Sequence, residues 1–281
     1  MRHFRETRRG ASREMSDPCG TVVMVSPEAT DVATLAGPGE VVAMSAELAT
    51  VSFRTKSSVV EGKPWTVVDS AVLSSTLPWR KFRWYKGQRH YSGVYWSATM
   101  HDHVVYESRL ELSRLIFADF DRGVQRILAQ PFLLKAKVDG KVRKHVPDYF
   151  LVTDRGPVVV DVKPEHLLAK PVVAFSFAWT RRLVEARGWQ YEVWSGAPPA
   201  EMENLRFLAG YRRPWLFDGA LLDEIRSTDV EGRTFGELAR GLGGRDPALS
   251  RAAVLHLLWL GELKTDLSAP LSDRHEIVRS A

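Results

Sequence analysis

The spacing of hydrophobic positions changes several times along the chain, and each change marks an expected element. Apolar side chains between residues 105 and 120 form one broad face at helical spacing, which predicts a helix. Downstream, the pattern predicts strands at residues 131–138, 142–152, 158–162 and 191–194, with a second helix at 172–186. The turns Asp139-Gly140 and 154–156 separate the first three strands. This order (helix, three strands, helix, strand) predicts an α/β fold with a mixed sheet flanked by helices.

The segments on either side of this pattern differ from it. Residues 1–75 show no sustained period, and we expect a poorly ordered N-terminal leader there, with a few short strands at most. The α/β pattern occupies residues 76–198, and a helical module follows at 199–281.

The C-terminal module carries clear helix boundaries. Thr234 and Glu237 form a capping box, and Asp246-Pro247 begins a further helix that runs to about residue 260. Residues 262–271 then fit a hairpin. Helix, turn, helix and hairpin in this order predict a winged helix-turn-helix domain.

Composition narrows the class of protein. The net charge of +5 and the pI near 9.3 fit a polyanionic partner such as nucleic acid. Cys19 is the single cysteine, which excludes an intrachain disulfide and a cysteine-based zinc site and favours a reducing, cytoplasmic setting. No apolar run approaches the roughly 20 residues that a membrane-spanning helix needs, so no membrane partner is expected.

Basic and aromatic residues alternate between residues 79 and 95, a stretch without an acid. Bases meet phosphates and flat rings stack on nucleotides, so this stretch fits a DNA surface. Strands whose aromatic side chains pack inward explain the same pattern equally well. A basic hairpin at residues 135–144 is either a phosphate-contacting edge or a charged edge that resists aggregation. The DNA-binding candidates are Arg80, Lys81, Arg83, Lys86, Arg89 and Lys144.

The chemistry-bearing residues flank the turn at residues 154–156. In a hairpin centred there, Asp148 and Asp161 are directly opposed, with Cβ atoms roughly 5 Å apart. Two carboxylates this close repel each other unless a cation lies between them, and Mg²⁺ prefers such hard oxygen ligands. Lys163 projects to the same strand face as Asp161, toward a metal-bound water or a phosphate. A solvated cluster of ion pairs is the structural alternative.

The sequence alone leaves two further assignments open. A third carboxylate from the preceding helix would complete the site, and Glu107 and Glu111 share one helical face. His145 either assists the site or is an ordinary histidine on a strand surface.

These motifs resemble the PD-(D/E)XK nuclease superfamily and, more narrowly, TnsA, the endonuclease subunit of heteromeric bacterial transposases. The resemblance covers about residues 79–194 and is carried by residues 108–112 (SRLEL), 130–132 (QPF), 147–152 (PDYFLV) and 161–164 (DVKP). It implies a restriction-endonuclease-like core and selects Glu111 over Glu107. The implied metal site consists of Glu111, Asp148, Asp161 and the Val162 carbonyl with Mg²⁺, or Mn²⁺ as a substitute, and Lys163 acts on water or phosphate. Asp161 stands where the founding TnsA pattern has glutamine, which indicates a divergent branch.

The resemblance also implies a function and partners. TnsA-like subunits cut double-stranded DNA at the 5′ ends of a mobile element, beside a DDE-type transposase that acts on the 3′ ends. An AAA+ ATPase regulator engages their C-terminal part, so the winged helix either docks protein or contacts DNA through Arg245, Ser250 and Arg251. We slightly favour docking, since Arg251 is the only base on that helix. The alternatives are a stand-alone nuclease in restriction or repair, and a non-catalytic DNA-binding protein on the same fold.

Overall fold

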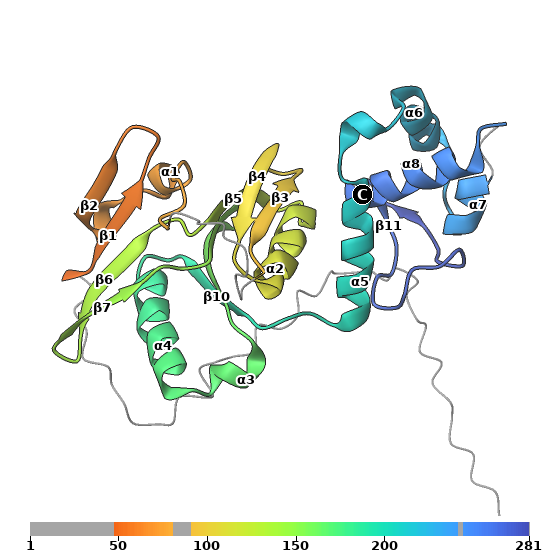
Figure 1. Cartoon of the computed structure of the whole chain (residues 1–281). Coiled ribbons are helices and arrows are strands. Elements are labelled where there is room, and N and C mark those ends of the chain that lie inside the picture. The colour runs from red at the N-terminus through yellow and green to blue at the C-terminus, as the bar shows by residue number, and fades with distance from the viewer. Residues whose placement is uncertain (1–47, 81–90, 241–243, 281) are drawn as a thin grey trace, which may run out of the picture.

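The computed structural model describes residues 48–80, 91–240 and 244–280. This part of the chain is a mixed α/β structure with several small sheets and eight α-helices. Strands β1 and β2 lie at one end of the molecule, and helices α5 to α8 lie together at the other (Figure 1). Within these ranges, the helices are all too short or too polar to cross a membrane.

The central sheet has the strand order β10-β9-β8-β5, antiparallel except for the β9–β10 pair. Its strands are β5 (Val124–Ala129), β8 (Tyr149–Thr153), β9 (Gly156–Val162) and β10 (Gln190–Trp194), and its flanking helices are α2 (Arg109–Phe120) and α4 (Pro171–Glu185). Along β9, Val158 and Val160 join the core on the α2 side, while Val159 joins the core on the α4 side. Because both faces are covered, β9 is apolar almost throughout.

The predicted strand at 131–138 is wrong as a member of this sheet, and of the strand predicted at 142–152 only the later part, β8, belongs to it. The first core strand is β5, whose bulge between Val124 and Arg126 removes the two-residue period that would have revealed it. Gln130, with φ of 46°, and Pro131 then turn the chain out of the sheet. The segment predicted as one strand at 142–152 is split at Pro147, which cannot donate a ladder hydrogen bond.

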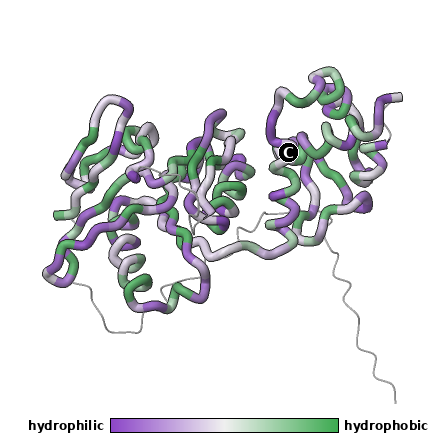
Figure 2. Tube along the Cα trace, viewed as in Figure 1, coloured by the Kyte–Doolittle hydropathy of each residue, from purple (hydrophilic) through white to green (hydrophobic). Residues whose placement is uncertain are grey.

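The displaced residues form a hairpin of β6 (Leu133–Val138) and β7 (Lys141–His145), turned at Asp139-Gly140 as predicted. The hairpin belongs to a second sheet with the order β2-β1-β6-β7. Hydrophilic and hydrophobic positions alternate along it (Figure 2), because Leu134, Ala136 and Val138 point into the core between the intervening lysines.

The expectation of a poorly ordered leader through residue 75 is wrong for its described part. Residues from 48 onward form β1 (Thr50–Arg54), β2 (Val59–Pro64), η3 (Trp65–Val67) and α1 (Ser70–Leu73). Strand β1 pairs with β6, about 80 positions further along the chain, and a local pattern cannot reveal so distant a partner. Residues 1–47 lie outside the described ranges.

Trp65 packs this N-terminal segment against helix α4. Its ring is buried, and its indole N–H donates to the Leu183 carbonyl of α4 at 2.8 Å. The Arg187 guanidinium lies over the rings of Trp65 and Trp189, at 4.5 and 3.9 Å from their centres. The segment therefore completes the core on the α4 side.

The helix predicted for residues 105–120 is shorter than expected. Residues 102–106 form β4 (Asp102–Tyr106), which pairs with β3 (Gly93–Ser97), and α2 begins only after Ser108. The apolar run at residues 104–106 fits a strand as well as a helix, and the pairing with β3 decides between them.

The C-terminal part contains the predicted helices. They are α5 (Pro199–Leu208), α6 (Gly219–Ser227), α7 (Phe235–Arg240) and α8 (Pro247–Trp259), with 3-10 turns η4 (Ala209–Tyr211) and η5 (Pro214–Leu216). The capping box is confirmed, since the Thr234 N–H donates to the Glu237 carboxylate at 2.8 Å and the Glu237 N–H donates to Thr234 Oγ1 at 3.3 Å. Asp246 caps α8 as predicted.

The predicted hairpin within residues 262–271 is wrong. Strand β11 (Leu263–Lys264) pairs with β12 (Val278–Arg279), so the connection is longer than the sequence pattern suggested. Asn204 of α5 fixes this connection through hydrogen bonds to the carbonyls of Leu267 and Ala269 and from the N–H of Leu271.

The C-terminal helices share a hydrophobic core with the central sheet. Helix α2 contributes Leu115 and Ile116 to the same cluster that holds Leu208 of α5 and Leu257 of α8. The rings of Phe120 and Trp259 lie 5.4 Å apart across this contact. Helix α2 is therefore covered by the sheet on one side and by α5 and α8 on the other.

Candidate metal and active site

Asp148 directly precedes β8, and Asp161 lies in the neighbouring strand β9. The ladder of β8 and β9 ends at the pair of Tyr149 and Val160, and the Asp148 N–H donates to the Val160 carbonyl at 3.0 Å. Asp148 therefore stands across from Val160, and the predicted direct opposition of Asp148 and Asp161 is shifted by one residue. The Asp148 carboxylate accepts a 2.6 Å hydrogen bond from the Val162 N–H at the end of β9.

The charges of the other predicted residues shift the pKa of Asp148. Burial raises the pKa of the Asp148 carboxyl well above its usual value, and the charges of Asp161 and Glu111 raise it further. The Val162 N–H and the Lys163 ammonium act in the opposite direction. Glu111 of α2, Asp161 of β9 and Lys163, which directly follows β9, thus lie within electrostatic reach of Asp148, an arrangement that a bound cation would stabilise.

Glu111 enters the site from the first turn of α2. Its N–H donates to the N-cap residue Ser108 at 3.1 Å, and its carboxylate accepts from the Glu107 N–H at 2.7 Å. Burial raises its pKa, which the capping hydrogen bonds partly offset. Glu107 instead forms a surface ion pair with Arg80 at 3.1 Å, so of the two candidates only Glu111 points inward. Glu111 caps the helix in addition to facing the site.

Asp161 is 2% exposed, and both of its carboxylate oxygens have partners. His145 Nε2 lies 2.8 Å from each oxygen, and the Tyr191 hydroxyl donates to one of them. His145 ends β7 and Tyr191 belongs to β10, so these partners come from two different sheets. Tyr191 was not predicted, because only the parallel β9–β10 pairing brings it beside Asp161.

The donor set fits a hard divalent cation. Carboxylate and carbonyl oxygens dominate, and the side-chain oxygen of Gln130 is buried without a partner in the described ranges, beside the strand end that carries Asp148. No three histidine, cysteine or acidic side chains of the described residues are gathered closely enough to hold an ion by themselves. Mg²⁺ does not require that, since it commonly binds one or two carboxylates and keeps several waters.

The predicted DNA-binding residues are only partly described. Lys81, Arg83, Lys86 and Arg89 lie outside the described ranges, and Arg80 is paired with Glu107. Lys144 is exposed on β7, directly opposite Lys135 on β6. Lys137 lies on this same outer face, which therefore carries three lysines and no acid.

The polar residues considered for α8 are engaged within the C-terminal part. Arg245 pairs with Glu224 at 3.2 Å and with Asp218 at 3.8 Å, and Arg251 pairs with Asp273 at 2.6 Å. Ser250 is buried. This arrangement leaves little of α8 available to read a DNA groove.

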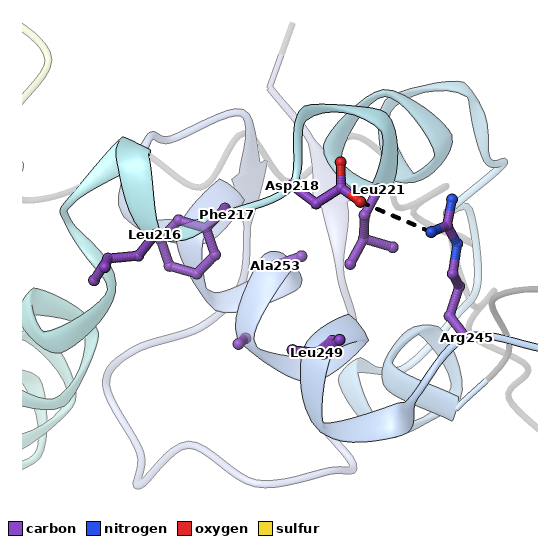
Figure 3. Close-up of a pocket in the computed structure, with 8 residues that line it drawn as sticks. Leu216, Phe217, Asp218, Leu221, Arg245, Leu249 and Ala253 are labelled. Atoms are coloured by element: carbon purple, nitrogen blue, oxygen red, sulfur yellow. Dashed lines mark ion pairs between the residues drawn. The ribbon is translucent and has the colours of Figure 1, made fainter.

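A small pocket of about 100 Å³ lies between η5, α6 and α8, and none of the residues that line it belongs to the candidate metal site (Figure 3). Its wall is largely apolar, with Leu216, Phe217, Leu221 and Leu249 facing the space and the Asp218–Arg245 ion pair at its rim. It contains no nucleophile and no metal-binding cluster, so we assign it no part in the chemistry.

No family model matches the chain, and no curated protein matches it.

Proposed function

We propose that this protein is a metal-dependent DNA endonuclease with a PD-(D/E)XK-type active site. The observation that carries the proposal is the clustering of Asp161, Glu111 and Lys163 around Asp148, whose pKa these charges perturb. A buried carboxyl group whose pKa is perturbed by neighbouring charges is typical of a functional site, and the lysine beside it fits one that binds a cation and a phosphate.

The residues have distinct roles in this proposal. Asp148, Asp161 and Glu111, with the Val162 carbonyl, would hold Mg²⁺ or Mn²⁺, which supplies an activated water and neutralises phosphate charge. Lys163 is half-buried near Asp148, where its ammonium would orient the water or offset the negative charge that develops on the phosphate. Helix α2 holds Glu111 and strand β9 holds Asp161, while Asp148 directly precedes β8 and Lys163 directly follows β9.

The fold supports the same class. Around the central sheet the elements run α2, β5, β8, β9, α4, β10, the order expected for a restriction-endonuclease-like core, with the β6–β7 hairpin inserted after β5. Three helices followed by a two-stranded ribbon also fit a C-terminal winged helix. Since its bases are paired internally, we favour protein docking over groove reading for that part.

The more specific proposal is the cutting subunit of a bacterial heteromeric transposase, acting in the cytoplasm on double-stranded transposon ends. It would work with a DDE-type transposase and an AAA+ ATPase regulator. The sequence motifs around Glu111, Asp148 and Asp161 support this assignment. Cleavage without any partner would instead favour a stand-alone restriction or repair nuclease.

Plasmid cleavage tests the proposal directly. A supercoiled plasmid carrying the element's ends would be incubated with the full chain and Mg²⁺ or Mn²⁺, with and without the product of the neighbouring gene. Asp148→Ala and Lys163→Ala should each reduce the cleavage rate at least 100-fold while far-UV circular dichroism stays unchanged. Asp102→Ala and Lys264→Ala remove exposed side chains of the same types and should cleave normally.

Retained cleavage in Asp148→Ala would refute the site. DNA binding without cleavage under every condition, with the transposase and regulator present, would favour the non-catalytic alternative.

A further inference from the structure

Arg143 lies on the inner face of the β6–β7 hairpin, opposite to the face that carries the lysines. It pairs with Ala136, and His145 pairs with Leu134, and both of these partners are buried. Residues two apart on a strand share a face, so Arg143 lies on the same side as His145, whose Nε2 is 2.8 Å from both Asp161 oxygens. One strand repeat, about 7 Å, therefore separates Arg143 from a residue that contacts the candidate site.

The guanidinium of Arg143 rests on an aromatic ring. Its central carbon lies 4.9 Å from the centre of the Phe175 ring of α4. Its Nε is buried without a hydrogen-bond partner, and no ion pair joins Arg143 to another described residue. The two terminal amino groups lack partners in the same part of the chain, but they are not among the buried atoms. Partial burial of an unpaired charge is costly, and an anion that reaches the amino groups would offset that cost.

Arg181, on the same helix as Phe175, shows the usual arrangement of a stacked arginine. Its guanidinium lies 5.2 Å from the centre of the Tyr191 ring and also donates to the Glu185 carboxylate at 3.2 Å. Arg143 has the ring without the carboxylate. The first turn of α4, one turn before Phe175, contains no acidic residue either, so this end of the helix supplies no anion of its own.

We propose that Arg143 is a phosphate clamp, a residue that binds the DNA backbone beside the phosphate to be cleaved. This inference rests on the proposed function and names a further substrate contact of that site. A guanidinium presents parallel N–H donors to two phosphate oxygens, a geometry that an ammonium group lacks. The lysines of the outer face attract the duplex through charge, and Arg143 fixes one strand relative to Asp161.

A purely structural role for Arg143 makes a different prediction. If the guanidinium only covers the Phe175 ring, its removal changes the stability of the fold and leaves the salt dependence of DNA binding as it was. The salt dependence therefore separates a phosphate contact from a packing contact.

DNA binding by the full chain tests the proposal without relying on cleavage. Fluorescence anisotropy over a salt series would follow a labelled duplex of the element's end that carries a non-cleavable linkage. Arg143→Gln should weaken binding by about 10-fold, the effect of losing one hydrogen-bonded charge contact, and should reduce the slope of log K against log salt by about 0.9. Arg143→Lys keeps the charge, so it should restore the slope while binding more weakly than the wild type.

Neutral phosphates locate the contact. In a set of duplexes, one phosphate at a time would be replaced by an uncharged methylphosphonate. The wild type should lose affinity for a duplex that is neutral next to the non-cleavable linkage, whereas Arg143→Gln should not respond to that same replacement. Removal of either partner removes the same interaction, so the two effects are not additive.

Arg181→Gln is the matched control, because it also removes a guanidinium that lies over an aromatic ring, and it should keep the wild-type slope. Thermal unfolding followed by circular dichroism identifies any variant that has lost its fold. An unchanged salt slope in a folded Arg143→Gln, or wild-type affinity in Arg143→Lys, would overturn the phosphate clamp and leave the cleavage test of Asp148→Ala to decide the proposed function. Failure of the wild type to bind the duplex, even with the transposase and regulator present, would overturn both.

Discussion

Asp148 is placed where its charge opposes the stability of the fold. Burial raises the pKa of its carboxyl group well above the usual value, and the nearby charges of Asp161 and Glu111 raise it further. The folded protein therefore keeps the Asp148 proton to higher pH than the unfolded chain does. The stability that this tighter proton binding contributes is fully present below the pKa of the unfolded chain, near 4. It is lost as the pH rises through the raised pKa of the folded protein.

Asp148→Asn should therefore be more stable than the wild type at pH 7–8 without metal, yet unable to cleave. Asparagine keeps an acceptor for the Val162 N–H and removes the ionised carboxylate. The melting temperature should rise by about 2–4 °C for each kcal/mol of repulsion removed, and the difference should close toward pH 4. Added Mn²⁺ should stabilise only the wild type. Thermal melts at several pH values, with and without Mn²⁺, measure all three effects, and a melting temperature lowered at pH 8 would contradict the account.

How far the sequence predicts the site depends on the range of each interaction. The hairpin around one local turn predicts that Asp148, Asp161 and Lys163 lie close together, although the ladder is shifted by one residue at Asp148. Glu111 required the resemblance, because the sequence pattern placed Glu107 on the same face of a longer predicted helix, whereas in the structure Glu107 precedes the N-cap Ser108. The contact of His145 with Asp161 joins residues 16 positions apart across two sheets, and Tyr191 reaches Asp161 only through the β9–β10 crossover. No pattern within a strand encodes such contacts.

At the scale of elements, the two faces of the β6–β7 hairpin differ in chemistry. The inner face buries Leu134, Ala136 and Val138 and carries His145 to Asp161. The outer face places Lys135 directly opposite Lys144. Like charges in directly opposed positions destabilise a strand pair, so a polyanion bound to this face would stabilise the hairpin.

Lys144→Glu should therefore raise the stability of the protein while weakening its binding to DNA. The new opposite-charge pair with Lys135 should contribute about 0.2–1 kcal/mol. Loss of one phosphate contact should reduce the slope of log K against log salt by about 0.9. Fluorescence anisotropy over a salt series and urea denaturation provide the two measurements. Lys264→Glu, on exposed β11, is the matched control, and an unchanged salt slope for Lys144→Glu would remove the hairpin from the DNA surface.

Helices and strands were predictable where the period of the hydrophobic positions and the signals at the element's ends agree. Helix α8, with Asp246 as N-cap and Pro247 in its first turn, was found almost to the residue. Strand β5 was missed, because a bulge and buried residues on both faces leave no alternation to detect. The 48–75 segment was missed for a different reason, since its strands depend on a partner hairpin far along the chain.

At the scale of the whole molecule, the described residues form two hydrophobic layers on the two faces of the central sheet. Trp65 is buried in the layer on the α4 side, and Trp259 is buried in the layer between α2 and the C-terminal helices. The central strands contribute residues to both layers, so loss of either layer exposes the same sheet. The N-terminal strands and the C-terminal helices are therefore expected to unfold together with the sheet, as one cooperative unit.

Trp65→Ala and Trp259→Ala should each lower the free energy of unfolding by about 3–5 kcal/mol, the usual cost of truncating a large buried aromatic residue. Although the two residues lie in opposite layers, each substitution should shift the same single transition rather than create a second one. Trp215→Ala is the matched control, because Trp215 is 62% exposed and should cost far less. Urea denaturation followed by circular dichroism at two wavelengths tests cooperativity. If Trp259→Ala gave an early transition confined to the C-terminal helices, those helices would be an independent domain, and the continuous core through α2 would not couple them to the sheet.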